Sequence, residues 1–294
     1  MATGNQTSGS LQESLPKLIA SARQVREFVG VMPNLVDRQR LGANTGENWN
    51  EIDLSQLTAQ NLAEDQMNDN VQRTEDTLLA IKPTITGITT ILTDVTQGRL
   101  SSNVLGQMGT LAQNAIQRKK DEDGLNVFAG AGTTLAGTGT SLSLGHISAA
   151  AVRITSNATE MGNAEAVVVH HGFPLKDIED ELRGGVGTNP IMPGITADTI
   201  ANRFRGTVTG AQVFEDGNIA INSTPDARGG VFARGTGGAI VLVEEANISV
   251  ETLRRPEIGM GADQVFVRDF FAYGERSNGN WLFALLNDAT APTS

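Results

Sequence analysis

The chain contains no cysteine, and only 4% of its 294 residues are aromatic. Without a thiol it cannot form disulfides, thiolate nucleophiles or cysteine-based metal sites. Its stability must therefore come from packing or from assembly with other chains. With few large aromatic anchors and 33 glycines, the composition favours a turn-rich chain with broad sheets or extended arms.

Positive charge is also scarce, because 22 Lys and Arg stand against 33 Asp and Glu, a formal net charge of −11. A protein that reads nucleic acid by neutralising phosphates needs a Lys/Arg-rich face, which this composition does not favour. No apolar run approaches the ~18 residues of a membrane-spanning helix. The first residues also lack the basic start and apolar core of a signal peptide, so we expect synthesis in the cytoplasm and no membrane partner.

The clearest periodicity lies between Gly98 and Gly124. Apolar side chains from Leu100 to Ile116 recur at helical spacing, which predicts a long amphipathic helix over residues 98–124. At ~1.5 Å per residue it would be roughly 35 Å long. Gly124 is predicted to terminate it. Gly109, like Gly106, costs about 1 kcal/mol relative to alanine inside a helix, so either something packs closely there or the helix bends.

Before this helix the sequence predicts an arm, a long polar segment and a strand. Helical spacing occurs between Leu11 and Val31, and residues 32–74 are polar and punctuated by glycine and asparagine. A segment of that length without its own core is usually functional or disordered, and we interpret it as an extended loop that lies on a neighbouring subunit. Residues 79–93 are typical of a strand, and Pro83 and Gly87 place it at a sheet edge or bulge.

After the helix, the pattern predicts an α+β arrangement. Helices over residues 147–159 and from Phe173 onward flank a short buried strand at 166–170, and a further helix is predicted between 196 and 206. From Thr207 the chain reads as a closing meander of strands, with Asn278-Gly279 as the turn of a hairpin. The strand candidates are 207–213, 218–221, 230–233, 239–243, 248–254, 265–273 and 281–286.

No catalytic constellation emerges from the residues. His170 and His171 are adjacent in a predicted strand and would point to opposite faces, so they form a zinc site only if His146 converges with them. The acidic run from Asp177 to Glu181 is most simply a solvated helix face. The alternative is a metal-dependent enzyme that uses one of these histidines with the acidic run. We assign no catalytic, cofactor-binding or metal residues and expect no cofactor.

Opposite charges gather at the end of the long predicted helix. These residues could form salt bridges with a neighbouring copy of the chain. Alternatively, they could pair with each other within the helix, where each pair contributes a few tenths of a kcal/mol. Both interpretations stay open at this point. The candidate inter-subunit contacts are Arg118, Lys119, Lys120, Asp121, Glu122 and Asp123.

Three segments, taken with the order of elements, resemble tailed-bacteriophage major capsid proteins of the HK97 fold. They are AIQRKKDEDGLNVFAG from Ala115, RGTVTGAQVFEDGNIAI from Arg205, and the region from Gly229 to Asp288. The resemblance implies an HK97-like α+β fold with a spine helix over 98–124. It further implies an N-terminal arm (1–31), an extended loop (32–75), a peripheral domain (76–146 and 247–294) and an axial domain (147–246).

The same resemblance implies a structural protein without enzymatic activity. Its subunits would assemble into hexamers and pentamers of an icosahedral head around double-stranded DNA that is not bound in a sequence-specific way. A separate scaffolding protein and a portal would be partners, and the protein would be made in the host bacterial cytoplasm and end in the virion. An encapsulin-type compartment of the same fold is the alternative.

Some members of this family cross-link their shells through a lysine of the extended loop. Here the lysines are Lys17, Lys82, Lys119, Lys120 and Lys176, and none lies within residues 32–75. We therefore expect no covalent cross-link.

Overall fold

The computed structural model describes residues 30–42, 46–54, 76–95, 104–156, 165–185, 206–208, 210–235, 237–259, 261–276 and 280–293, with positions 57, 59, 61 and 64. The chain is a mixed α+β protein, as predicted. Its elements are α3 (Met32–Leu35), β1 (Asp37–Arg40), β2 (Trp49–Leu54), β3 (Asp76–Ile81), β4 (Thr84–Thr93), α5 (Val104–Asn126), η1 (Val127–Gly130), β5 (Thr134–Ala136), α6 (Leu144–Thr155), β6 (Glu165–His170), α7 (Gly172–Gly185), β7 (Thr207–Val208), β8 (Ala211–Glu215), β9 (Asp226–Arg234), β10 (Ile240–Arg255), β11 (Ala262–Glu275) and β12 (Leu282–Asp288).

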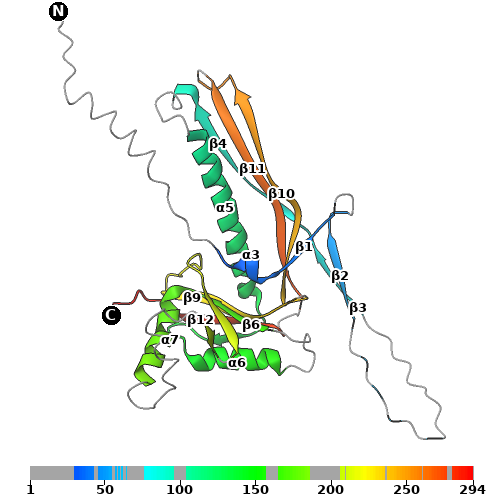
Figure 1. The fold of residues 1–294 in the computed structure, drawn as a ribbon, viewed down its shortest axis with the longest axis vertical. Coiled ribbons are helices and arrows are strands. Elements are labelled where there is room, and N and C mark those ends of the chain that lie inside the picture. Colours follow the sequence, from blue (N-terminus) through cyan, green and yellow to red (C-terminus); the bar gives the residue numbers. More distant parts are fainter. Residues whose placement is uncertain are drawn as a thin grey trace, which may run out of the picture.

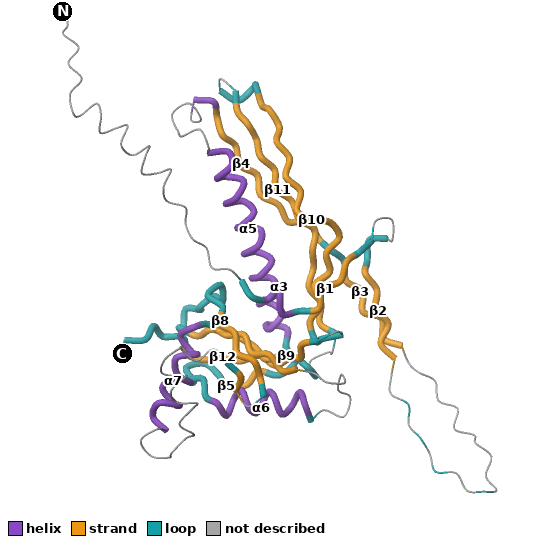
Figure 2. Tube along the Cα trace, viewed as in Figure 1, coloured by secondary structure: helices purple, strands orange, loops and turns teal. Residues whose placement is uncertain are grey.

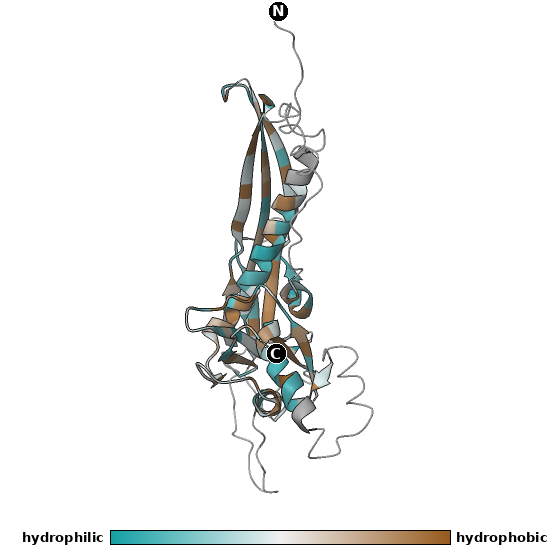
Figure 3. Cartoon of the chain, turned by 90° about the vertical axis from the view of Figure 1, so that its left-hand side faces the viewer, coloured by the Kyte–Doolittle hydropathy of each residue, from teal (hydrophilic) through white to brown (hydrophobic). Residues whose placement is uncertain are grey.

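The strands form two main sheets and a separate hairpin (Figure 1). A long four-stranded sheet has the order β1-β10-β11-β4, and α5 runs along it. A six-stranded sheet has the order β5-β12-β9-β6-β8-β7 and contacts α6. Strands β2 and β3 pair with each other and project from the rest of the chain (Figure 2). Seen from the side, the long sheet and α5 form a thin unit of two layers (Figure 3).

The largest cluster of buried apolar side chains lies around the six-stranded sheet. There the fully buried Phe128 of η1 and Phe232 of β9 place their ring centroids 5.9 Å apart. A smaller cluster joins Ala112 and Ile116 of α5 to Val265 and Val267 of β11. Two residues of the predicted helix face, Ala112 and Ile116, therefore pack against the long sheet, whereas Leu111 of that face is 37% exposed. Within the described parts of the chain, no helix is long and apolar enough to cross a membrane.

Helix α5 does not end at Gly124, contrary to the prediction, but continues to Asn126. The reason for the glycine is close packing, because a Cβ there would lie 2.9 Å from the Cβ of Met32 and 3.0 Å from Cζ of Tyr273. At Gly109 a Cβ would meet no atom within 4 Å. Close packing therefore does not explain that glycine.

The closing strands differ from the predicted meander, because they belong to both sheets. The candidates 239–243 and 248–254 form one strand, β10, with register shifts between Glu244 and Ser249. Residues 218–221 form no strand and contribute one isolated bridge, from Ile221 to Ala227. The hairpin prediction at Asn278-Gly279 is wrong, because β11 lies in the long sheet and β12 in the six-stranded sheet. Local turn chemistry cannot reveal that the chain changes sheets.

The strand predicted over residues 79–93 is two strands, β3 and β4, divided at Lys82 and Pro83. Its placement at a sheet edge is confirmed for β4. The predicted docking of residues 32–74 on a neighbour does not hold for residues 32–41. Met32 and Leu41 are buried in this chain, and β1 pairs in parallel with β10. The predicted helices in 11–31 and 196–206 lie outside the described residues, apart from their last positions.

Candidate assembly surfaces and charged junctions

The charged run at the end of α5 divides into an exposed and a buried part. Arg118 lies 3.6 Å from Glu122, and Lys119 lies 2.6 Å from Asp123, both as pairs four residues apart on the helix. These residues keep exposed surface. Pairing within the helix is therefore observed, and contact of these four residues with a neighbouring subunit stays a prediction.

Lys120 and the next residue, Asp121, point into the chain instead. The Nζ atom of Lys120 lies 2.7 Å from Glu244 of β10 and 2.7 Å from Asp269 of β11. The same ammonium group lies 5.0 Å from the ring centroid of Phe271. Because Lys120 is only 3% exposed and Asp121 is fully buried, these two candidates bind α5 to its own chain and offer no surface to another copy.

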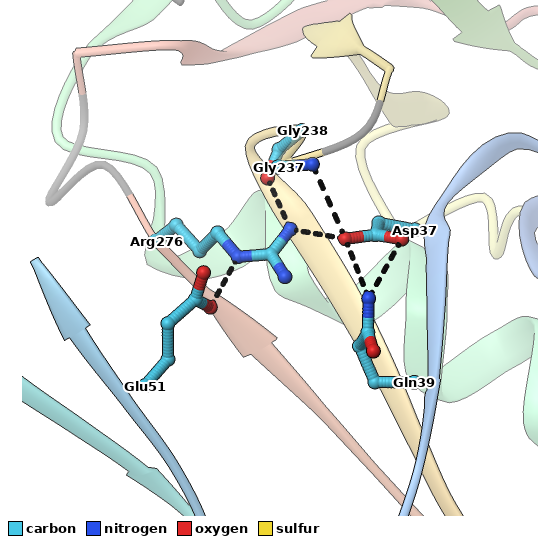
Figure 4. A network of polar contacts seen from close by, with 6 residues as sticks. All are labelled: Asp37, Gln39, Glu51, Gly237, Gly238 and Arg276. Carbon is cyan, nitrogen blue, oxygen red and sulfur yellow. Dashed lines mark hydrogen bonds and ion pairs between the residues drawn. The ribbon is translucent and has the colours of Figure 1, made fainter.

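A second charged junction holds the root of the β2–β3 hairpin (Figure 4). Arg276, directly after β11, donates from Nε to Glu51 of β2 at 2.6 Å and forms an ion pair with Asp37 of β1 at 2.7 Å. Its guanidinium group also lies over the ring of Trp49, 5.7 Å from the centroid, and donates to the carbonyl of Gly238 at 3.1 Å. Arg276 therefore ties together the chain entering β1, the first hairpin strand and the end of β11.

Arg276 was not among the residues predicted from the sequence. Its hydrogen-bond partner Glu51 is 225 residues away in the sequence, and no local motif marks either residue. The only available signal was a single cation following a long predicted strand. That signal does not identify a partner.

The β2–β3 hairpin has two unused edges in the described part of the chain, because its strands pair only with each other. An isolated two-stranded hairpin is at best marginally stable in water. At its outer part Ile52 is 59% exposed. The hairpin is therefore a candidate surface for contact with another chain.

Among the described residues, α5 covers one face of the long sheet and the other face is left open. Val265 and Val267 of β11 face α5, so the alternate residues of the sheet lie on the opposite face. Along that opposite face the register places Ile91 beside Gln264 and Leu253 in one row. Ile85, Ile91 and Leu253 are 67%, 48% and 45% exposed. The open face is thus partly apolar and is a second candidate contact surface.

The histidines and acidic residues considered for metal chemistry are buried, half-buried or hydrogen-bonded within this chain. His170 is fully buried, and burial lowers its pKa to about 4. Burial also lowers the pKa of His171 and raises that of Asp177. His146 forms a capping box with Ser143 at the start of α6.

Glu181 accepts a hydrogen bond from the backbone N–H of Leu144 at 2.9 Å. It therefore supports the start of α6. Among the residues that the structure describes, no group of three or more His, Cys, Asp or Glu could hold a metal ion.

No family model and no curated protein matches this chain. Solved structures do match over nearly its whole length. The capsid asymmetric unit of cyanophage Pam1 is 10% identical, with a TM-score of 0.73 and coverage of 99% of this chain and 100% of that chain. A structure from Mycobacterium phage Che8 is 17% identical, with a TM-score of 0.68 and coverage of 92% and 95%.

The holo-SrpI encapsulin complex of Synechococcus elongatus also matches, at 10% identity, a TM-score of 0.61 and 99% coverage of both chains. At these identities the likeness concerns the fold. The resemblance to phage capsid proteins that was identified from the sequence is therefore confirmed at the level of the fold.

Proposed function

We propose that this chain is the major capsid protein of a tailed bacteriophage. In this proposal copies of the chain assemble as hexamers and pentamers into an icosahedral head that encloses double-stranded DNA. The observation that carries the proposal is the match to a phage capsid subunit over 99% of this chain and 100% of that chain. Matching over entire chains argues for a shared architecture rather than a shared motif.

The parts of the chain take the following roles in this proposal. Helix α5 is the spine helix, the long sheet is the core of the peripheral domain, and the six-stranded sheet with α6 and α7 is the core of the axial domain. Strands β5 and β12 are part of that sheet, so they join the axial domain although they lie outside its predicted residues 147–246. Strand β2 lies in the extended loop of residues 32–75, its partner β3 begins directly after that loop at Asp76, and residues 1–31 form the N-terminal arm. The open sheet face and the hairpin edges then become contacts between neighbours. Many such contacts, each weak alone, stabilise a closed symmetric shell through avidity.

The subunit acts mechanically, not catalytically. The buried state of His170 and the helix-supporting role of Glu181 favour structural roles for both groups. The net charge of −11 suits an inner surface that does not grip DNA. A separate scaffolding protein and a portal are the expected partners, with synthesis in the host cytoplasm and final localisation in the virion.

A compartment of the encapsulin type is the second candidate, and the match to the SrpI encapsulin complex favours it. The two functions differ in what the shell encloses. Particles from infected or expressing cells would contain nuclease-protected DNA in the first case and a co-purifying cargo protein in the second.

The direct test is negative-stain electron microscopy of the purified protein together with size-exclusion chromatography. The proposal predicts closed polyhedral particles, or rings of five and six subunits, that run as single-chain bands on a denaturing gel. A ladder of multimers on that gel would refute the absence of cross-links. A monomer that does not assemble even with its scaffolding protein, and that carries a stoichiometric metal, would support the enzyme alternative instead.

A further inference from the structure

The start of the described chain is held by two buried carboxyl groups. The backbone N–H of Met32 donates to Oδ1 of Asp121 at 3.0 Å, and the N–H of Val31 donates to Oδ2 of Asp216 at 3.1 Å. Gly30 lies directly over the first carboxyl, since a Cβ there would be 2.0 Å from Cγ of Asp121. Residues 30–32 therefore rest on both carboxyl groups at once.

The two carboxyl groups come from different parts of the fold and share one further ligand. Asp121 lies near the end of α5, and Asp216 follows β8 of the six-stranded sheet. Asn218 donates to both of them, from its backbone N–H to Asp216 at 2.9 Å and from Nδ2 to Asp121 at 2.8 Å. Both carboxyl groups are fully buried.

No lysine or arginine in the described ranges forms an ion pair with either carboxyl group. Lys120 is adjacent in sequence, but its ammonium group is engaged by Glu244 and Asp269. Two neighbouring carboxylates in a buried site without a cation cannot both ionise without a large energetic cost, so the pair retains a proton.

We propose that Asp121 and Asp216 form a proton-dependent latch, which holds residues 30–32 against the base of α5 while the pair shares a proton and loosens them when that proton is lost. With the proton present, the two carboxyl groups can bond to each other and still accept both backbone N–H groups. Once both groups are ionised, they repel each other across Asn218.

The electrostatics agree with this geometry. Burial has the largest effect and raises the pKa of Asp216 to about 7. The negative charge of Asp121 acts in the same direction, while the backbone N–H groups of Asn218 and Val31 act in the opposite direction. A carboxyl pKa that is raised by folding gives a stabilisation that is complete below the ordinary pKa of a carboxyl group and is lost as the pH rises through about 7. The latch is therefore closed in mild acid and opens in mild alkali.

Other charged groups surround the latch from the elements packed against it. Burial and the charge of Asp121 raise the pKa of Tyr273 on β11, whose hydroxyl is buried without a hydrogen-bond partner in the described part of the chain. This phenol therefore stays neutral throughout the range in which the pair titrates. The remaining groups are Arg38 on β1, Lys120 and Asp123 on α5, Glu215 on β8, Glu244 on β10 and Asp269 on β11.

Hydrogen exchange followed by mass spectrometry tests the latch in the full-length protein. We expect protection of a peptide covering residues 30–36, corrected for intrinsic exchange, to fall at least tenfold between pH 6 and pH 8. A peptide from β9 should keep its protection. In Asp216→Asn only one carboxyl can ionise, so the drop should disappear.

Asp121→Asn removes the other carboxyl group of the pair and should also abolish the drop. This variant replaces the first one in the experiment if Asp216→Asn does not fold. The matched control is Asp123→Asn, which removes a partly exposed carboxylate, paired with Lys119, two residues away on the same helix and should keep the drop. The latch is overturned if wild-type protection does not change with pH, or if both pair variants keep the wild-type profile. It is also overturned if the drop vanishes in His171→Gln, since His171 lies beside Glu215 and would then be the titrating group.

Discussion

Replacement of Lys120 by alanine should destabilise the protein far more than the same replacement at Lys119. The two lysines are neighbours on α5, but Lys120 is 3% exposed and lies between Glu244 and the 1% exposed Asp269. Removing one partner of a buried ion pair costs about 3–5 kcal/mol, because the remaining charge is left without compensation. An exposed helix pair such as Lys119 with Asp123 contributes only about 0.3–0.5 kcal/mol.

This difference is large relative to the whole free energy of unfolding, which is about 5–15 kcal/mol for native proteins. Urea denaturation followed by far-UV circular dichroism measures it, on protein that size-exclusion chromatography shows to be unassembled. With a urea slope of about 3 kcal/mol per M, the midpoint of Lys120→Ala should fall by about 1–2 M. Lys119→Ala should shift the midpoint by no more than about 0.2 M.

A paired substitution separates the charge effect from the loss of packing. Lys120→Met with Asp269→Asn keeps most of the side-chain volume and removes the unpaired charge at Asp269, so it should recover part of the loss seen in Lys120→Ala. The reasoning is refuted if Lys120→Ala costs less than about 1 kcal/mol, or if Asp269→Asn makes the Lys120→Met variant less stable.

Three further predictions concern the six-stranded sheet and α5. The pKa of His170 is lowered from 6.5 to about 4, so its contribution should be complete above pH 6.5 and fall by about 3 kcal/mol as the pH drops to about 4. Urea midpoints over that range should decline less steeply in His170→Gln than in wild type, and equal slopes would contradict this account. Gly230→Ala places a Cβ 2.3 Å from the ring of Phe128 and should cost about 1–3 kcal/mol. Gly109→Ala, where a Cβ meets nothing within 4 Å, should stabilise α5 by up to about 1 kcal/mol, and thermal unfolding of both variants checks the opposite signs.

The elements that the sequence predicted correctly are those with a strong local signal. Helices α5 and α6 have apolar residues at helical spacing, and β6 is a short β-branched run, so each could be identified without knowledge of its surroundings. The observed ends of these elements differ from the predicted ends by a few residues, because capping or packing determines where each element begins and ends. Ser143, for example, caps α6 before its apolar spacing begins.

Features set by distant partners could not be predicted in this way. The polar residues of β1 carry no strand signal, and their pairing with β10 depends on main-chain hydrogen bonds across the fold. Gly124 has the position of a helix terminator, but its role is to let Met32 approach α5. Arg276 and Lys120 look like ordinary surface cations in the sequence, and only the fold supplies their carboxylate partners.

We propose that this chain builds a shell partly through the β2–β3 hairpin, whose strands pair only with each other in the described part of the chain. A cryo-electron microscopy reconstruction of assembled particles tests it most directly. The account predicts a closed shell in which each hairpin, still anchored at its root by Arg276, packs on an adjacent copy. Particles that are not closed, or a closed shell in which the hairpin touches no neighbour, would contradict it.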